Sequence, residues 1–304
     1  MGKAMVVVTG ANGFIGAALC RELAAQGVGV IAVVNKSDSN VKEIPGVEVL
    51  HCELSQYSKL STLIGRKRDI DVFYHFAWAG TSGDLRGNVD IQLANVKAAC
   101  EAVEACKDIG CKRFVFAGSI MEYEIDAYMQ TEKMPSRNTL YCTAKLSGDY
   151  MARTVAADCG VEYMRAIISN VYGPGEYSAR LINTSIRKML RGEHCAFSSG
   201  EQLYDFIYID DAARAFIAVG KRGISNKTYY IGNAVPRKLK EFLCQLRDVV
   251  NPALKIGLGE IPFNGVSLSY NELSTDNVTA DTGFVPQIDF VTGIRRTVEW
   301  IRGH

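Results

Sequence analysis

The stretch that decides the fold is Met-Val-Val-Val-Thr-Gly-Ala-Asn-Gly-Phe-Ile-Gly, residues 5–16. An apolar run long enough for a strand leads into Gly10, Gly13 and Gly16, and an amphipathic helical pattern follows. In such a junction the first glycine permits a tight turn, the second lets the backbone approach a pyrophosphate, and the third lets the helix pack on its strand. The N–H groups at the helix start would face the phosphates. A turn that uses glycine for its geometry alone is the alternative, but the place at the first strand–helix junction favours dinucleotide binding.

The first half of the chain alternates apolar β-branched runs with helical patterns. The helical patterns cover residues 14–26, 60–65, 89–109 and 140–158, and the strand patterns cover 5–9, 28–34, 47–51, 72–76, 113–117 and 162–168. Strands that are apolar throughout and separated by helices are typical of a parallel sheet covered on both faces. Right-handed crossovers then predict an α/β fold, a Rossmann-like doubly wound sheet.

The second half is less regular. It contains helical patterns near 181–191, 239–249 and 291–302, strand patterns at 205–209 and 228–231, and a helix start at Asp210-Asp211. No repeat and no low-complexity linker interrupts it. We therefore expect a dinucleotide-binding domain over residues 1–170, rejoined by parts of 204–232, and a smaller substrate-binding lobe formed mainly by residues 171–304.

Composition excludes several classes of protein. The chain has 304 residues, 48% of them hydrophobic and 22% charged, with a net charge of +1, which argues against a disordered or collagenous chain and gives no reason to expect a nucleic-acid or membrane partner. The nine cysteines form no CxxC pair and no zinc-spaced cluster with histidine, so we expect no metal site. Scattered cysteines and an N-terminus without a signal-peptide core predict a cytoplasmic protein.

A second signal is Tyr141 followed four residues later by Lys145, which places both on one face of a predicted helix. A phenol titrates near ~10, and bringing it near 7 requires roughly 4 kcal/mol of differential stabilisation, part of which a neighbouring ammonium can supply. The pair therefore suits proton transfer to or from a carbinol or carbonyl oxygen. Ser119 ends a predicted strand where its hydroxyl can meet the same oxygen, and Asn95 lies in the preceding helix.

In their order and spacing, these residues and the glycine turn resemble the extended short-chain dehydrogenase/reductase superfamily. Residues 75–80 (His-Phe-Ala-Trp-Ala-Gly), 170–175 (Asn-Val-Tyr-Gly-Pro-Gly) and 200–211 extend the resemblance over almost the whole chain. It points to the nucleotide-sugar branch, the NAD-dependent epimerases and dehydratases. Members act on a sugar carried by a nucleoside diphosphate.

The resemblance implies a role for each matched residue. Tyr141 would be the general acid/base, Lys145 would hold the nicotinamide ribose and lower the pKa of the tyrosine, and Ser119 would bond the reacting sugar oxygen. Trp78 lies just past a strand end, where open α/β sheets bind ligands. The predicted substrate-binding residues are Trp78, Ser119, Met121, Asn170, Arg180 and Tyr204. The predicted cofactor-binding residues are Gly10, Asn12, Gly13, Phe14, Ile15, Gly16, Asn35, Lys36, Glu53, Leu54, Phe76, Ala77, Asn95, Tyr141 and Lys145.

Three departures from the family pattern narrow the expectation. Arg165 and Asn170 are more widely separated than usual, so only Asn170 is carried over. Tyr204 stands where many relatives carry an arginine for the diphosphate, a contact that Arg180, Arg187 or Lys188 would have to replace. Ile120 and Met121 stand where 4,6-dehydratases have an Asp-Glu pair, so we do not expect that reaction.

We therefore expect an enzyme that transfers a hydride at C4 of a nucleoside-diphosphate sugar. Within this class we favour a 4-keto-6-deoxysugar reductase. A nucleotide-sugar 4-epimerase with tightly bound NAD is the alternative within this class. A non-catalytic dinucleotide-binding sensor or scaffold is the alternative outside it. The resemblance also implies a homodimer that pairs the predicted helices 89–109 and 140–158 across a two-fold axis.

The cofactor preference depends on the end of the second strand, where an acidic residue would bind the ribose 2′-hydroxyl of NAD. Asn35, Lys36 and Ser37 occupy that place, and the first acid, Asp38, comes late. An amide, an ammonium and a hydroxyl can all donate to a 2′-phosphate. This favours NADP(H) over NAD(H), with Lys36 as the main contact. The alternative is that Lys36 points into water and either cofactor binds.

Overall fold

The computed structural model describes residues 4–36, 39–65, 69–130, 134–271 and 273–304. Its centre is a parallel sheet with strand order β11-β6-β5-β4-β1-β2-β3, the order of a doubly wound fold. This confirms the fold class. The strands are β1 (Met5–Thr9), β2 (Gly29–Val34), β3 (Val47–His51), β4 (Ile70–His75), β5 (Arg113–Ser119), β6 (Glu162–Ile168) and β11 (Thr228–Ile231).

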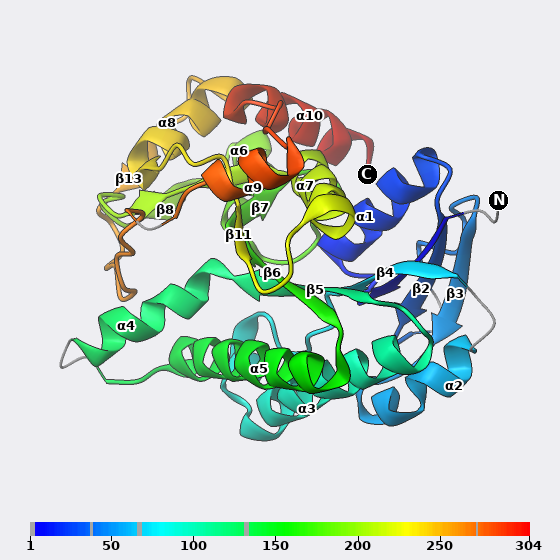
Figure 1. Cartoon of the computed structure of the whole chain (residues 1–304). Coiled ribbons are helices and arrows are strands. Elements are labelled where there is room, and N and C mark those ends of the chain that lie inside the picture. The colour runs from blue at the N-terminus through cyan, green and yellow to red at the C-terminus, as the bar shows by residue number, and fades with distance from the viewer. Residues whose placement is uncertain (1–3, 37–38, 66–68, 131–133, 272) are drawn as a thin grey trace.

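Helices cover both faces of this sheet (Figure 1). On one face lie α3 (Val89–Asp108) and α5 (Arg137–Cys159), and on the other lie α1 (Phe14–Ala25) and α7 (Ile209–Arg222). Within β1, Val6 and Val8 pack in one hydrophobic cluster and Val7 packs in the other. Because successive strand residues point to opposite faces, a strand covered on both faces has to be apolar throughout.

The C-terminal part adds helices and short strand pairs on the side of the sheet where α1 and α7 lie (Figure 1). Its helices are α6 (Leu181–Leu190), α8 (Leu239–Val250), α9 (Asp276–Thr282) and α10 (Phe290–Gly303). Its strands pair as β7 (Asn170–Tyr172) with β10 (Phe206–Tyr208), β8 (Cys195–Phe197) with β13 (Ile256–Leu258), and β9 (Leu203–Tyr204) with β12 (Arg237–Lys238).

The strand expected at 205–209 is shorter: it is β10 (Phe206–Tyr208), which Asp205 separates from β9, and Ile209 already belongs to α7. The Asp205 carboxylate accepts hydrogen bonds from the backbone N–H of Asn233, that of Ala234 and the Tyr230 hydroxyl. β9 on one side of Asp205 pairs with β12, whereas β10 on the other side pairs with β7. The buried Asp205 carboxylate therefore lies where the chain changes from one strand partner to another. The alternation of apolar residues in the sequence does not show this change.

Helix ends also differ from their predicted positions. The helix expected from residue 140 begins at Arg137, because the Ser136 hydroxyl accepts the N–H of Asn138 and Thr139 caps Ser136 in return. The segment expected as a helix at 60–65 is α2 (Leu60–Ile64), preceded by the 3-10 helix η1 (Leu54–Lys59). Four further short helices among the described residues were not predicted: η2 (Gly83–Gly87), η3 (Ile120–Tyr123), α4 (Glu124–Met129) and α9 (Asp276–Thr282).

Candidate active site

A cavity of about 390 Å³ follows the carboxyl ends of the central strands. It brings together most of the residues proposed from the sequence. Those that line it are Gly10, Asn12, Gly13, Phe14, Ile15, Gly16, Asn35, Leu54, Phe76, Ala77, Trp78, Ser119, Met121, Tyr141, Lys145, Asn170 and Arg180.

The glycine turn forms one end of the cavity. Gly10 has φ +66°, and a Cβ there would lie 2.7 Å from the backbone nitrogen of Ala77. A Cβ at Gly16 would lie 2.3 Å from the carbonyl oxygen of Gly10. No side chain caps the start of α1, and its first turn holds no acidic residue. The backbone N–H groups at the start of α1 and the space above them fit the pyrophosphate of a dinucleotide.

The end of β2 contributes less to the cavity than the sequence suggested. Asn35 lines it and accepts a hydrogen bond of 3.1 Å from the Asn12 side chain, while His51 bonds the Asn35 carbonyl oxygen. Lys36 is exposed and does not line the cavity. Ser37 and Asp38 lie outside the described residues.

Three other proposed residues do not line the cavity. Glu53 is exposed before η1, and its neighbours on both sides face the cavity instead. Tyr204 stacks on Phe206 with ring centroids 5.6 Å apart. Asn95 is fully buried, and its amide bonds both the N–H and the C=O of Ala79. Its position therefore supports the loop after β4.

Ser119 and Tyr141 meet at the other end of the cavity. Ser119 is the last residue of β5, and Tyr141 comes from the first turns of α5. Burial raises the pKa of Tyr141 to about 12, although its hydrogen bond with Ser119 and the nearby guanidinium of Arg86 lower it. The Arg86 guanidinium lies 4.8 Å from the centre of the tyrosine ring. Tyr141 consequently keeps its proton at neutral pH and is set to donate it.

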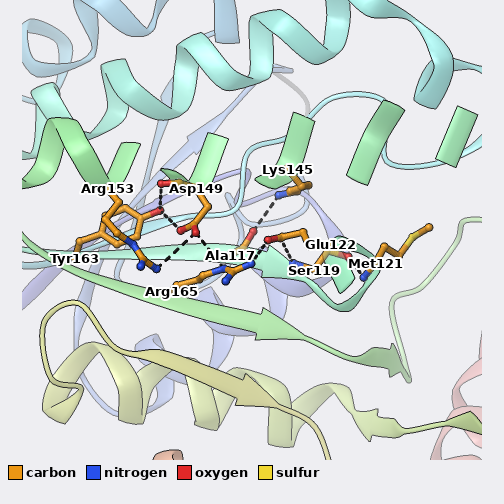
Figure 2. Close-up of polar contacts among 9 residues, drawn as sticks. All are labelled: Ala117, Ser119, Met121, Glu122, Lys145, Asp149, Arg153, Tyr163 and Arg165. Atoms are coloured by element: carbon orange, nitrogen blue, oxygen red, sulfur yellow. Dashed lines mark hydrogen bonds and ion pairs between the residues drawn. The ribbon is translucent and has the colours of Figure 1, made fainter. Parts of the chain in front are cut away.

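Lys145 lies one turn further along α5. Its ammonium donates to the carbonyl oxygen of Ala117 at 2.9 Å (Figure 2) and lies 3.9 Å from the centre of the Trp78 ring. Burial lowers the pKa of Lys145 to about 8, and the charges of Glu122 and Asp149 oppose this. The resemblance assigned to Lys145 the lowering of the Tyr141 pKa. The guanidinium groups of Arg86 and Arg180 both lower the pKa of Tyr141.

Sequence reasoning missed four charged residues around this end: Arg86 in η2, Glu122 in η3, Asp149 in α5 and Arg165 in β6. Two of them have a local signal. The run from Ser119 to Glu122 has the spacing of a capping box, and Asp149 follows Lys145 by one helical turn. Arg86 has none, since the bond that connects it to α5 joins it to Asn138, which is distant in sequence.

Over the described residues, no helix is long and apolar enough to cross a membrane. In the same part of the chain, no group of three or more His, Cys, Asp or Glu side chains could hold a metal ion. All nine cysteines are free thiols.

The comparison with protein families decides the assignment. The profile described as "NAD dependent epimerase/dehydratase family" matches residues 6–232, which is most of the chain. The chain belongs to this family. The resemblance seen in the sequence is therefore confirmed.

Individual relatives are distant. A dTDP-glucose 4,6-dehydratase of Escherichia coli is 29% identical over 167 residues, so the match spans 53% of this chain and about half (46%) of that protein. A CDP-abequose synthase of Salmonella typhimurium is 23% identical over 98% of both chains. The solved structure of UDP-glucose 4-epimerase from Thermotoga maritima, with UDP-glucose, has a TM-score of 0.83 at 22% identity and covers 98% of this chain and 99% of its own. That likeness shows a shared fold.

Proposed function

We propose that this family member is an NAD(P)-dependent oxidoreductase that acts at C4 of a nucleoside-diphosphate sugar. The observation that carries the proposal is the layout of one cavity. The glycine turn lies at one end, and Ser119, Tyr141 and Lys145 lie at the other. A non-catalytic sensor or scaffold would have no need of these three side chains in that arrangement.

The residues of the cavity fit a dinucleotide cofactor, which supplies hydride chemistry when bound. The start of α1 and the space above Gly10 and Gly16 would hold its pyrophosphate. The nicotinamide half would lie toward Lys145, whose ammonium faces the cavity. Tyr141 would donate its proton to the sugar C4 oxygen while Ser119 donates a hydrogen bond to the same oxygen.

Within this class we favour the 4-keto-6-deoxysugar reductase. A tyrosine that keeps its proton at neutral pH is ready to protonate the oxygen of a 4-keto group, as a 4-keto-6-deoxysugar reductase requires. The 4-epimerase is the second candidate, and the fold shared with UDP-glucose 4-epimerase favours it.

The side chains after Ser119 argue against a 4,6-dehydratase. Ile120 is buried and apolar, and Met121, which lines the cavity, cannot transfer protons. Glu122 is the first acid, and its carboxylate is already held by the Ser119 N–H and by Arg165.

Arg180 is the proposed contact for the substrate diphosphate. It precedes α6, lines the cavity and pairs with Glu176 at 3.2 Å while keeping half of its side chain exposed. Arg187 bonds the backbone of Glu176 and does not line the cavity, and Lys188 is exposed. A guanidinium with free donors suits a phosphate oxygen pair.

For the cofactor, we propose a preference for NADP(H). The end of β2 offers the Asn35 amide at the cavity and, next in the sequence, the exposed ammonium of Lys36, with no carboxylate among the described residues 33–36 to repel a 2′-phosphate.

The proposed assembly is a homodimer through α3 and α5. These helices lie side by side on one face of the sheet (Figure 1), and Val89, Leu93 and Met151 on them are each more than half exposed. A second copy of the chain would cover these apolar side chains. Sedimentation should show a dimer that Leu93→Glu weakens, and a stable, fully active monomer would contradict this assembly.

The test of the function begins with ligands. A thermal-shift screen of nucleoside diphosphates and their sugars, with NADP+ present, should single out one base, because a ligand at 100 Kd adds ~2.7 kcal/mol of apparent stability. With the best substrate, Tyr141→Phe should lower kcat by about 10²–10⁴-fold and leave dinucleotide binding measurable. Tyr150→Phe, an exposed change on the same helix, is the control. Near-native turnover by Tyr141→Phe would overturn the proposed mechanism.

A further inference from the structure

A cluster of charged side chains lies beneath the reactive end of the cavity without lining it. Figure 2 shows Arg165 between two carboxylates, Glu122 from η3 and Asp149 from α5. The side chains of Glu122, Asp149 and Arg165 are only 1%, 0% and 11% exposed. Replacing such a cluster by apolar residues is often neutral or stabilising, so fold stability alone gives no reason for charges at this place.

The cluster reaches Ser119 through Glu122. One carboxylate oxygen, Oε1, accepts the backbone N–H of Ser119 at 2.6 Å, and the other, Oε2, contacts the guanidinium of Arg165. The Ser119 hydroxyl in turn accepts the N–H of Met121 at 3.3 Å. Gly118 leaves room for this arrangement, since a Cβ there would lie 3.0 Å from Glu122 Oε1. Glu122 thus holds the backbone from which the Ser119 hydroxyl projects.

The cluster faces Lys145 from two elements. Asp149 lies one turn beyond Lys145 on α5, where it accepts the Tyr163 hydroxyl at 2.9 Å and pairs with Arg165 at 3.2 Å and Arg153 at 3.5 Å. Glu122 comes from η3, and its negative charge, like that of Asp149, raises the pKa of Lys145.

Among the described residues, the other groups recorded next to Lys145 carry no negative charge. They are the rings of Trp78 and Phe116, the Ala117 carbonyl group, and His75, whose pKa burial lowers to about 3, so that it is neutral. Tyr141, one turn earlier on α5, keeps its proton at neutral pH.

We propose that Glu122, Asp149 and Arg165 are positioning residues, which hold Ser119 in place and supply the negative charge opposite the Lys145 ammonium. Arg165 keeps the two carboxylates together. Its positive charge balances the negative charge that would remain if Lys145 were the only cation beside the two carboxylates. The part of this inference that concerns turnover rests on the proposed function, whereas the part that concerns the charge of Lys145 does not.

The test therefore measures Lys145 directly. Competitive acetylation of the folded protein with acetic anhydride over a range of pH, read by mass spectrometry, gives the pH at which Lys145 loses its proton. Glu122→Gln keeps the shape and the acceptor for Ser119 but removes the charge, so this midpoint should fall by about one pH unit. Asp149→Asn, which keeps an acceptor for Tyr163, should lower it in the same direction.

The control is Glu162→Gln, which removes an exposed carboxylate paired with Arg113 at the start of the same strand as Arg165. It should leave the midpoint of Lys145 where it is. Circular dichroism identifies any variant that does not fold, and the other carboxylate variant then carries the test. An unchanged midpoint in the folded variants, or an equal fall in Glu162→Gln, would overturn the proposal even if no sugar nucleotide proves to be a substrate.

With a substrate in hand, a second readout follows. Glu122→Gln should move the alkaline limb of the kcat profile to lower pH together with the Lys145 midpoint, and change KM for the sugar nucleotide less than about threefold. A fall in kcat with an unmoved pH profile would count against the assigned role.

Discussion

At one end of the cavity the surface is main chain: Gly10 and Gly16 bring backbone groups together, and the start of α1 supplies N–H donors. At the other end the surface is side chain: Ser119 and Tyr141 meet above charges that come from η3, α5 and β6. The first end needs residues that are small, and the second needs partners that are distant in sequence. Substitutions at the first end should therefore act by taking up the space that a ligand needs. Substitutions at the second end should act by changing the balance of buried charge.

The largest expected effect is on stability at the second end. Arg165→Met leaves the carboxylates of Glu122 and Asp149 buried without their shared partner, and it should lower the free energy of unfolding by about 3–5 kcal/mol. Urea denaturation measures it. Lys97→Met is the control, because its partner Glu101 is one turn away on a surface where such a pair contributes about 0.3–0.5 kcal/mol. Equal losses of unfolding free energy in the two variants would show that the buried cluster contributes no more to stability than an exposed ion pair.

At the first end, Gly10→Ala should weaken dinucleotide binding by at least about tenfold, which is ~1.4 kcal/mol. The added Cβ would clash with the backbone of Ala77, a residue that lines the cavity. Gly27→Ala is a matched control, with a similar φ of +77° but nothing within 4 Å of the new Cβ. Both variants should lose about 1–2 kcal/mol of stability from the left-handed backbone. Fluorescence titration should find weakened binding in Gly10→Ala alone, and a similar affinity in both would contradict the argument.

A smaller effect concerns Lys36, which follows β2 near the first end. Lys36→Ala should reduce the ratio of NADPH to NADH affinity by about tenfold, since a charged hydrogen bond to phosphate contributes about 1.5–3 kcal/mol when it is fully formed. Parallel Kd measurements for the two cofactors decide it. Equal affinities in the wild-type protein, or NAD that co-purifies with it, would refute the proposed preference.

The smallest effect is a pH dependence next to the second end. Burial raises the pKa of Glu124 from its usual 4.5 to about 7, with Arg86 opposing. Because the folded protein then binds this proton more tightly than the unfolded chain, the associated stability is complete below about pH 4.5 and is lost as the pH rises through about 7. Glu124→Gln should flatten the fall in unfolding free energy over this interval, whereas the exposed change Glu299→Gln should not. An unchanged slope in Glu124→Gln would show that its carboxyl titrates normally.

The amino-acid sequence by itself determined the doubly wound sheet and the family. Apolar runs of strand length record burial on both faces, and the spacing of Gly10, Gly13 and Gly16 records a local backbone geometry, so neither needs a distant partner to be recognised. Tyr141 and Lys145 were recognisable for the same reason, as neighbours on one turn of helix.

Only the tertiary structure decided which charges meet at the reactive end. Arg165 reaches the neighbourhood of Ser119 because β6 pairs in parallel with β5, in the register that sets Arg165 beside Phe116. Asp149 joins them because α5 packs across these strands. Such meetings depend on strand register and helix packing, which are cooperative properties of the whole core. For the same reason Lys145 has a carbonyl group and an indole ring as its partners, and Arg86 is the cation beside Tyr141.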